Sequence, residues 1–130
     1  MILSIGVDLV DMRVVDRNIN TTRRIFTDEE VALAKSRPGQ YVQTLGKRLA
    51  VKEAVMKALG IDNSLGSVSL KDIEVVLSNS GRPYVNLHGN AGIKLKEITP
   101  VGYIPIVDVS ISDDGIMAVA MALIHARPSV

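Results

Sequence analysis

Residues 51–59, Val-Lys-Glu-Ala-Val-Met-Lys-Ala-Leu, constrain the fold of this chain more than any other segment. At about 100° per residue, the valines and alanines fill one broad face of a helix. Glu53 and Lys57 lie on the opposite side, where Leu49 and Met56 flank Glu53. A solvent-exposed face rarely surrounds an acid with Leu and Met, so we expect this helix to be covered on both sides, with Glu53 and Lys57 in a pocket or an interface. The alternative is an ordinary surface Glu–Lys pair, worth about 0.3–0.5 kcal/mol.

Length and composition exclude several classes of protein. A chain of 130 residues predicts one domain over 1–130, and 47% hydrophobic content excludes a disordered chain. A net charge of +1 and an aromatic content of 3% argue against a nucleic-acid partner. The absence of Cys fits a reducing compartment. We see neither a signal peptide nor a membrane span, so we expect a cytoplasmic protein that does not bind membranes.

Periodicity and turn residues predict an α+β fold with a mostly antiparallel sheet packed against a long helix. A capping box at Thr27 and Glu30 begins a helix over 28–36, and Gly60 ends the long helix over 40–59. Both faces of the last strand are apolar, so we expect it to be central and covered on each side. The other expected elements are strands over 2–10, 73–77, 84–87, 104–112 and 116–124, and a short helix over 91–98 capped by Asn90.

Carboxylates are the strongest candidates for chemistry. His88 precedes a turn glycine and His125 lies in a C-terminal tail, and both are expected to face solvent, which argues against a zinc site. Mg²⁺ prefers oxygen ligands and takes one or two protein carboxylates, with waters and substrate phosphates completing its shell. Asp8, near the end of the first strand, and Glu53 suit this role, and Lys57 is placed to neutralise phosphate charge. Spacing leaves other pairings open, including an ion pair between Asp8 and a nearby arginine.

Basic residues are concentrated near the N-terminus. Four arginines lie within twelve residues, at Arg13, Arg17, Arg23 and Arg24. This cluster is either a solvated surface or a docking patch for an acidic partner.

Two segments together resemble the signature of the 4′-phosphopantetheinyl transferases. Residues 6–10 (GVDLV) are followed, after about forty residues, by residues 48–60 (RLAVKEAVMKALG). The short length and the N-terminal position of the first motif are similar to the holo-acyl-carrier-protein synthase branch. Residues 72–75 (DIEV), the turn 81–83 (GRP) and residues 109–113 (VSISD) agree as well. The resemblance covers essentially the whole chain.

This resemblance implies a Mg²⁺-dependent transferase, with Mn²⁺ as a possible substitute, that acts in fatty acid and other lipid biosynthesis. The reaction moves 4′-phosphopantetheine from coenzyme A to a serine of apo-acyl carrier protein and releases adenosine 3′,5′-bisphosphate. Asp8 and Glu53 match the metal-binding acids, and Lys57 matches the lysine beside the reacting phosphate. Either a metal-bound water or Glu53 accepts the serine proton.

The family also implies binding sites and an assembly. We expect a compact homotrimer with coenzyme sites at subunit interfaces. Because acyl carrier proteins are acidic, the resemblance favours a docking role for the arginine cluster 13–24. The expected coenzyme contacts are Arg48, Lys52, the loop from Gly60 to Gly66, and the turn Gly81-Arg82-Pro83.

Two residues depart from the family pattern. Leu49 stands where the family often has Phe or Trp, and Asp113 stands where many members have His. These departures bear on the pantetheine pocket and on the role of that His, and not on the reaction class. Two rival hypotheses are an inactive carrier-binding module, which would have lost one of Asp8, Glu53 or Lys57, and a Mg²⁺-dependent phosphohydrolase that uses water as the nucleophile.

Overall fold

A computed structural model describes residues 1–15, 18–61 and 68–130. The elements agree with the predicted ones to within a few residues, with the addition of a short helix, α1, that contains part of the arginine cluster. In chain order they are β1 (Ile2–Asp11), η1 (Met12–Val14), α1 (Ile19–Ile25), α2 (Asp28–Lys35), α3 (Tyr41–Ala58), η2 (Leu70–Asp72), β2 (Ile73–Leu77), β3 (Pro83–Leu87), α4 (Gly89–Ile98), β4 (Tyr103–Asp114) and β5 (Met117–Pro128).

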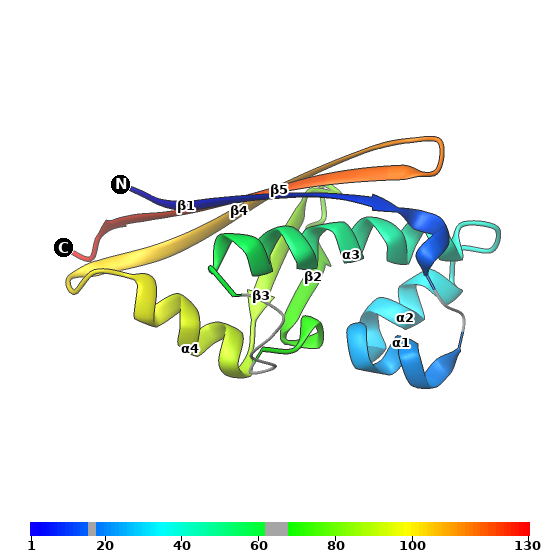
Figure 1. The fold of residues 1–130 in the computed structure, drawn as a ribbon, viewed down its shortest axis with the longest axis horizontal. Coiled ribbons are helices and arrows are strands. Elements are labelled where there is room, and N and C mark those ends of the chain that lie inside the picture. The colour runs from blue at the N-terminus through cyan, green and yellow to red at the C-terminus, as the bar shows by residue number, and fades with distance from the viewer. Residues whose placement is uncertain (16–17, 62–67) are drawn as a thin grey trace.

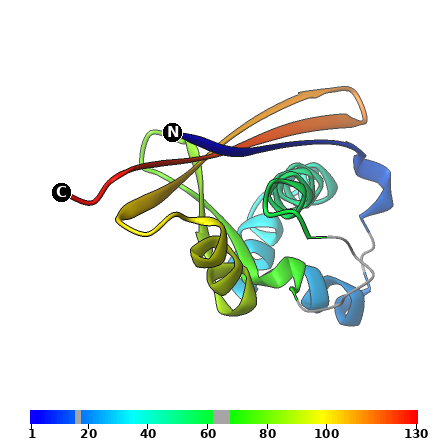
Figure 2. The same ribbon diagram turned by 60° about the vertical axis from the view of Figure 1, so that its left-hand side comes forward.

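The architecture has the long helix α3 at its centre. A three-stranded antiparallel sheet, in the order β1-β5-β4, packs on one side of α3 (Figure 1). The hairpin β2-β3 and the helix α2 contact other sides of α3, and β3 also contacts β4 of the sheet (Figure 2). The predicted α+β class and antiparallel pairing are confirmed. The hairpin β2-β3 forms a second sheet rather than extending the first.

Small residues let α3 approach the sheet closely. A Cβ added at Gly6 of β1 would lie 2.1 Å from the carbonyl oxygen of Ala54 in α3, so only glycine fits there. Leu49 and Met56 are both buried within the single chain, which confirms that α3 is covered on both sides. A second copy is therefore not needed to explain these two residues. Gly60 ends the helix as predicted, with φ at 73° and its N–H donating to the Lys57 carbonyl.

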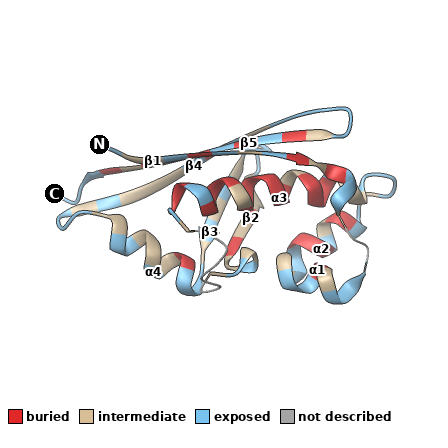
Figure 3. Ribbon diagram, viewed as in Figure 1, coloured by how far each residue is buried: buried red, intermediate tan, exposed pale blue. Residues whose placement is uncertain are grey.

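The strand β5 is central, as predicted, but it is covered on one face only. Its inward side chains, including Ala118 and Ile124, are fully buried against α3. Val119 and Met121 on the other face are 37% and 47% exposed. Within the single chain the expected cover on the second face is therefore missing, because no element of the described residues packs on the outer face of the sheet. Figure 3 shows α3 as mostly red, whereas much of the three strands is tan or pale blue.

Three smaller expectations are corrected. The helix α4 begins at Gly89 with His88 in the N-cap position, so Asn90 lies inside its first turn instead of capping it. His125 lies within β5 rather than in a tail, and its Nε2 is 2.7 Å from Oδ2 of Asp108 across the strand pair. In the described part of the chain, no helix is both long enough and apolar enough to cross a bilayer.

Candidate active site

The strand β1 and the helix α3 bring Asp8, Glu53 and Lys57 together. Lys57 donates to Oδ1 of Asp8 at 2.7 Å and to the carbonyl of Val7 at 3.1 Å. The close packing of Gly6 against α3, two residues before Asp8, is what makes this contact possible. Asp8 therefore pairs with Lys57 and not with an arginine. The surface-pair alternative for Glu53 and Lys57 is wrong, because the ammonium pairs with Asp8 instead.

The two carboxyl groups perturb each other. Burial first, and then the neighbouring Asp8, raise the pKa of Glu53 to about 7. Burial raises the pKa of Asp8, but Glu53 and Lys57 outweigh it and the pKa of Asp8 is lowered overall. When both groups are charged, Oδ2 of Asp8 is buried without a hydrogen-bond partner among the described residues. A proton on Glu53 supplies that missing donor, which adds to the effect of burial in raising the pKa of Glu53.

This pair of acids has the chemistry of a site for a hard cation. A buried carboxylate oxygen without a donor, beside a second carboxyl group, is the arrangement that a divalent cation would satisfy. Among the described residues, no three His, Cys, Asp or Glu side chains gather into a larger metal-binding group. Two carboxylates suit Mg²⁺, which commonly completes its shell with water and substrate phosphates.

A second cluster of predicted residues surrounds a hollow of about 550 Å³. Arg48 of α3, Asp113 of β4 and the turn Gly81-Arg82-Pro83 all line it, together with Arg37 and Lys47. Arg48 is only 4% exposed and donates one hydrogen bond, at 3.0 Å, to the carbonyl of Thr44. Its Nε and second terminal nitrogen find no acceptor among the described residues. The hollow is therefore rich in cations, and one of its guanidinium groups has unused donors.

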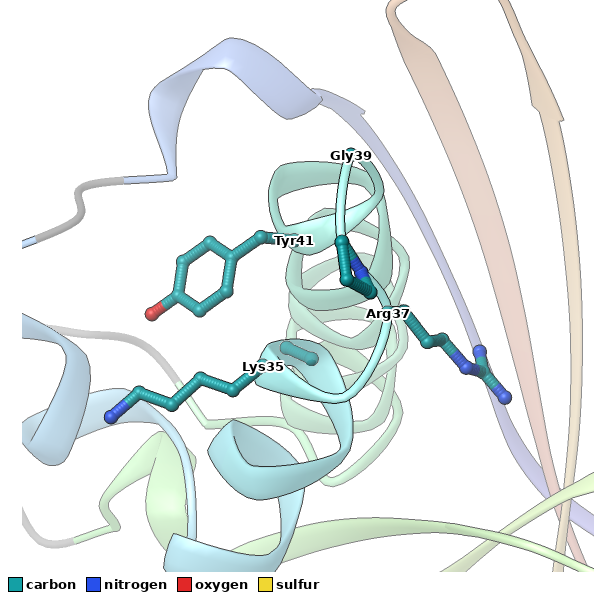
Figure 4. Close-up of a pocket in the computed structure, with 6 residues that line it drawn as sticks. Lys35, Arg37, Gly39 and Tyr41 are labelled. Carbon is teal, nitrogen blue, oxygen red and sulfur yellow. The ribbon is translucent and has the colours of Figure 1, made fainter.

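Another hollow lies between the end of α2 and the start of α3 (Figure 4). Lys35 and Tyr41 point to one side of it, whereas Arg37 points the opposite way, toward the strands of the sheet. Arg37 therefore lines the hollow of Arg48 as well. Neither hollow is lined by Asp8 or Glu53.

Lys52 does not lie where a coenzyme could reach it. Its side chain is fully buried, and its ammonium pairs with Oε1 of Glu30 at 2.9 Å and donates to the carbonyls of Leu70 and Ile73. Burial lowers the pKa of Lys52, and Glu30 opposes this effect. All three ammonium donors are occupied, so the predicted contact between Lys52 and a coenzyme phosphate is wrong in this structure.

The remaining predicted residues are at the surface or outside the described residues. Gly60 lines a hollow of about 280 Å³ beside α4, whereas Gly66 lies outside the described residues. Arg23 and Arg24 are exposed in the last turn of α1. Arg13 is exposed and pairs with Asp11 at 2.7 Å, and Arg17 lies outside the described residues.

Comparison with known proteins relates this geometry to a family. The family model described as the 4′-phosphopantetheinyl transferase superfamily matches residues 4–103. The chain belongs to the 4′-phosphopantetheinyl transferase superfamily. A relative from Paramagnetospirillum magneticum, named holo-[acyl-carrier-protein] synthase, is 37% identical over 99% of this chain and 100% of its own length. A relative of the same name from Azorhizobium caulinodans is 40% identical over 98% of this chain and 96% of its own.

A solved structure shows the same fold. The Chronobacterium ammoniagenes ACPS–CoA complex superimposes with a TM-score of 0.79 and 30% identity, over 95% of this chain and 97% of that one. The family predicted from the motifs 6–10 and 48–60 is thus confirmed, and so is the fold. Asp8, Glu53 and Lys57 of the phosphopantetheinyl transferase motifs are all present and lie together.

Three charged residues that contact or lie beside the predicted site residues were missed by sequence reasoning. Arg37 and Lys47 line the cationic hollow, and Glu30 is the partner of Lys52. In the sequence, nothing except their charge marks Arg37 and Lys47 as candidate site residues. In the sequence, Glu30 stands out only as the end of a capping box, which the structure confirms at 2.8 Å and 3.2 Å. Its second role, accepting from Lys52 and from the N–H of Val75, depends on contacts between residues distant in sequence.

Proposed function

We propose that this protein transfers 4′-phosphopantetheine from coenzyme A to a serine hydroxyl of an apo-acyl carrier protein, as a step in fatty acid biosynthesis in the cytoplasm. The observation that carries the proposal is the group formed by Asp8, Glu53 and Lys57, which unites both family motifs in one place. The names of the relatives from Paramagnetospirillum magneticum and Azorhizobium caulinodans support it.

Asp8 and Glu53 would hold a Mg²⁺ ion, or Mn²⁺ in its place. The support is the buried oxygen of Asp8 that lacks a donor and the raised pKa of Glu53. A divalent cation would bind that oxygen and would favour the charged form of Glu53. When bound, the ion would supply positive charge against the diphosphate of the coenzyme. Lys57 is exposed and now neutralises Asp8, so it would be free to turn toward a phosphate once the cation takes its place.

The reaction is a displacement at phosphorus. The serine oxygen forms a bond to the β-phosphorus of coenzyme A, and the bond from that phosphorus to the bridging oxygen breaks. Adenosine 3′,5′-bisphosphate leaves with the bridging oxygen, and the serine proton is released. Charge grows on the bridging and non-bridging oxygens, and Lys57 is placed to stabilise it by charge-assisted hydrogen bonds.

The hollow around Arg48 and Arg82 would bind phosphate groups of the coenzyme. Its support is the excess of cations and the unused donors of Arg48. Nine residues separate Arg48 from Lys57, which places them about 180° apart around α3. The two clusters of one chain therefore face opposite ways, and we propose that one coenzyme is held by the Asp8 cluster of one chain and the Arg48 cluster of another.

A homotrimer would supply that arrangement. The outer face of the sheet exposes a band of large apolar side chains that a single chain leaves uncovered: Ile5, Val7, Leu9, Val119 and Met121. Contiguous exposed apolar surface of this kind is typical of an association site. A ring of three chains with head-to-tail contacts would bury this face. It would also bring the Asp8 cluster of one chain beside the Arg48 cluster of the next.

The exposed arginines of α1 would dock the acidic carrier protein. Arg23 and Arg24 lie in the last turn of this short helix. Arg13 contributes less charge than the sequence indicates, because Asp11 holds its guanidinium through both carboxylate oxygens. The support for docking is thus strongest at Arg23 and Arg24.

Mass spectrometry of an apo-carrier protein tests the proposal. With coenzyme A and Mg²⁺, we expect the carrier to gain one phosphopantetheine group, and Asp8→Asn or Glu53→Gln to lower the rate about a hundredfold or more, since a lost metal contact removes several kcal/mol of stabilisation. The exposed Glu29→Gln is the control and should keep full activity. Coenzyme A turnover without a modified carrier would favour the phosphohydrolase, and binding of the carrier without turnover would favour the inactive module.

A further inference from the structure

The ion pair between Lys52 and Glu30 is buried and has no part in the transfer described so far. Both side chains are at most 1% exposed, and their charged atoms are 2.9 Å apart. Lys52 immediately precedes Glu53, so any force that sets the position of Lys52 also acts on the neighbouring residue of the proposed metal site.

Every charged atom of the pair is used. The Lys52 ammonium also donates to the carbonyls of Leu70 in η2 and Ile73 in β2, and it lies 5.6 Å from the centre of the Phe26 ring. The Glu30 carboxylate accepts from the N–H of Thr27 at 2.8 Å through one oxygen and from the N–H of Val75 at 3.1 Å through the other. One pair thereby connects α2, α3, η2 and β2.

Stability alone is a weak reason for such a pair. Removing two charges from water is costly, and well-packed apolar residues of similar volume often stabilise a protein as well or better. Apolar residues, however, do not fix the rotation of a helix. Charge-assisted hydrogen bonds depend on angle and distance, whereas apolar contacts tolerate a small rotation or slide of a helix.

The pair holds α3 on the side opposite the sheet. Ala54 meets Gly6 of β1 on one side, and Lys52, about 200° around the helix from Ala54, meets Glu30 on the other. Glu53 lies between these two fixed points. A rotation of α3 would therefore move Glu53 relative to Asp8, and the Lys52 bonds oppose that rotation.

We propose that the Glu30–Lys52 pair is a positioning device that sets the rotation of α3 and so places Glu53 and Lys57 against Asp8. This inference rests on the proposed transfer for its kinetic consequence. Lys52 acts through Glu53 and Lys57 and does not touch the substrates. An error of about 1 Å in such a site is enough to lower the rate about a hundredfold.

The test replaces the pair by apolar residues of similar size, Glu30→Leu/Lys52→Met. The matched control makes the same two changes at exposed positions, Glu29→Leu/Lys71→Met. Three quantities are measured: thermal unfolding by circular dichroism, kcat and KM for each substrate, and Mn²⁺ affinity by electron paramagnetic resonance. The last measurement does not depend on transfer.

We expect the apolar pair to fold with a Tm about 5–15 °C below the wild type, because exchanging the ion pair itself is close to neutral but the N–H of Val75 and the carbonyl of Ile73 lose their partners. We expect its kcat to fall about ten- to a hundredfold and its Mn²⁺ affinity about tenfold, with KM for the carrier within about twofold. The control should match the wild type in all three. A folded apolar variant with wild-type kcat and Mn²⁺ affinity would overturn the proposal.

A second variant covers the case in which the apolar pair does not fold. Glu30→Gln/Lys52→Met keeps an amide that can accept from Thr27, and the same losses of kcat and Mn²⁺ affinity are expected. If neither variant folds at 25 °C, the pair is required for the fold itself and the positioning role is refuted. If the wild type modifies no carrier, the proposed transfer fails, while a lower Mn²⁺ affinity in the variant still supports positioning.

Discussion

Glu53 is half-buried beside Asp8, and this position raises its pKa from an ordinary 4.5 to about 7. Between these pH values the folded protein holds a proton that the unfolded chain releases, so the free energy of unfolding falls as the pH rises through this window. Glu53→Gln cannot titrate. We therefore expect it to be more stable than the wild type above pH 7 by about 1–2 kcal/mol, discounted for partial exposure, and to lose this advantage below pH 4.5.

Urea unfolding at pH 4, 6 and 8 in metal-free buffer measures this difference. Asp8 does not contribute to this difference. Its pKa is lowered from 3.8, so the stabilisation from its charged form is lost only below pH 3.8, outside the range in which Glu53 titrates. The exposed Glu29→Gln is the control and should show no such pH dependence. A Glu53→Gln advantage of equal size at pH 4 and pH 8 would contradict the assignment of the raised pKa to Glu53.

At the scale of the elements, the contact between β1 and α3 decides the shape of the site. A methyl group at Gly6 would lie 2.1 Å from the Ala54 carbonyl and 2.7 Å from the Ala58 N–H, so α3 would have to move away from β1. We expect Gly6→Ala to lower the free energy of unfolding by about 1–3 kcal/mol and to reduce transfer by separating Lys57 from Asp8. Gly92→Ala in α4, where the nearest atom is 3.3 Å away, is the control. Equal stabilities of the two variants, measured by urea unfolding, would contradict this account.

The helix α1 carries the prediction about the carrier protein. Reversing the charge of Arg23 and Arg24 together, as R23E/R24E, should raise KM for the carrier roughly tenfold and flatten its dependence on salt, because screening acts on exposed charges. KM for coenzyme A should not change. Steady-state kinetics at several salt concentrations measures both, with the exposed Lys96→Glu on α4 as the control. An equal change in both KM values would place these arginines at the nucleotide site or in the fold instead.

At the scale of the whole molecule, the two clusters on opposite sides of α3 predict a shared site. Light scattering should give three times the mass of the 14.0 kDa chain, and Leu9→Lys, on the exposed apolar face, should dissociate the trimer.

Complementation between two variants tests the shared site directly. Asp8→Asn and Arg82→Glu should each be inactive alone. When the two variants are mixed and exchange subunits, about a quarter of the interfaces should become active. At these interfaces the Arg82→Glu chain supplies an intact Asp8 cluster and the Asp8→Asn chain supplies an intact Arg48 cluster. A fully active monomer, or no recovery in mixed trimers, would refute the shared site.

Sequence alone determined most of the elements and the family of this protein. The alternation over 2–10, the capping box at Thr27 and the Gly60 stop are local patterns, and the structure places β1, α2 and the end of α3 where they predict. Asp8 and Glu53 could be selected because two short motifs, taken together, resemble one family, which the matched relatives confirm. These features depend on neighbours in the chain or on residue identity.

Tertiary structure decided which charges meet. Lys52 and Lys57 are five residues apart in one helical run, yet the first is fully buried against Glu30 and the second is exposed and pairs with Asp8. Periodicity could not separate them, because their partners lie 22 and 49 residues away and are selected by the packing of α3 between two layers. The outer face of β5 depends on the fold for the same reason: an apolar pattern shows that a face avoids water, whereas the packed fold decides whether the same chain covers it or leaves it for another copy.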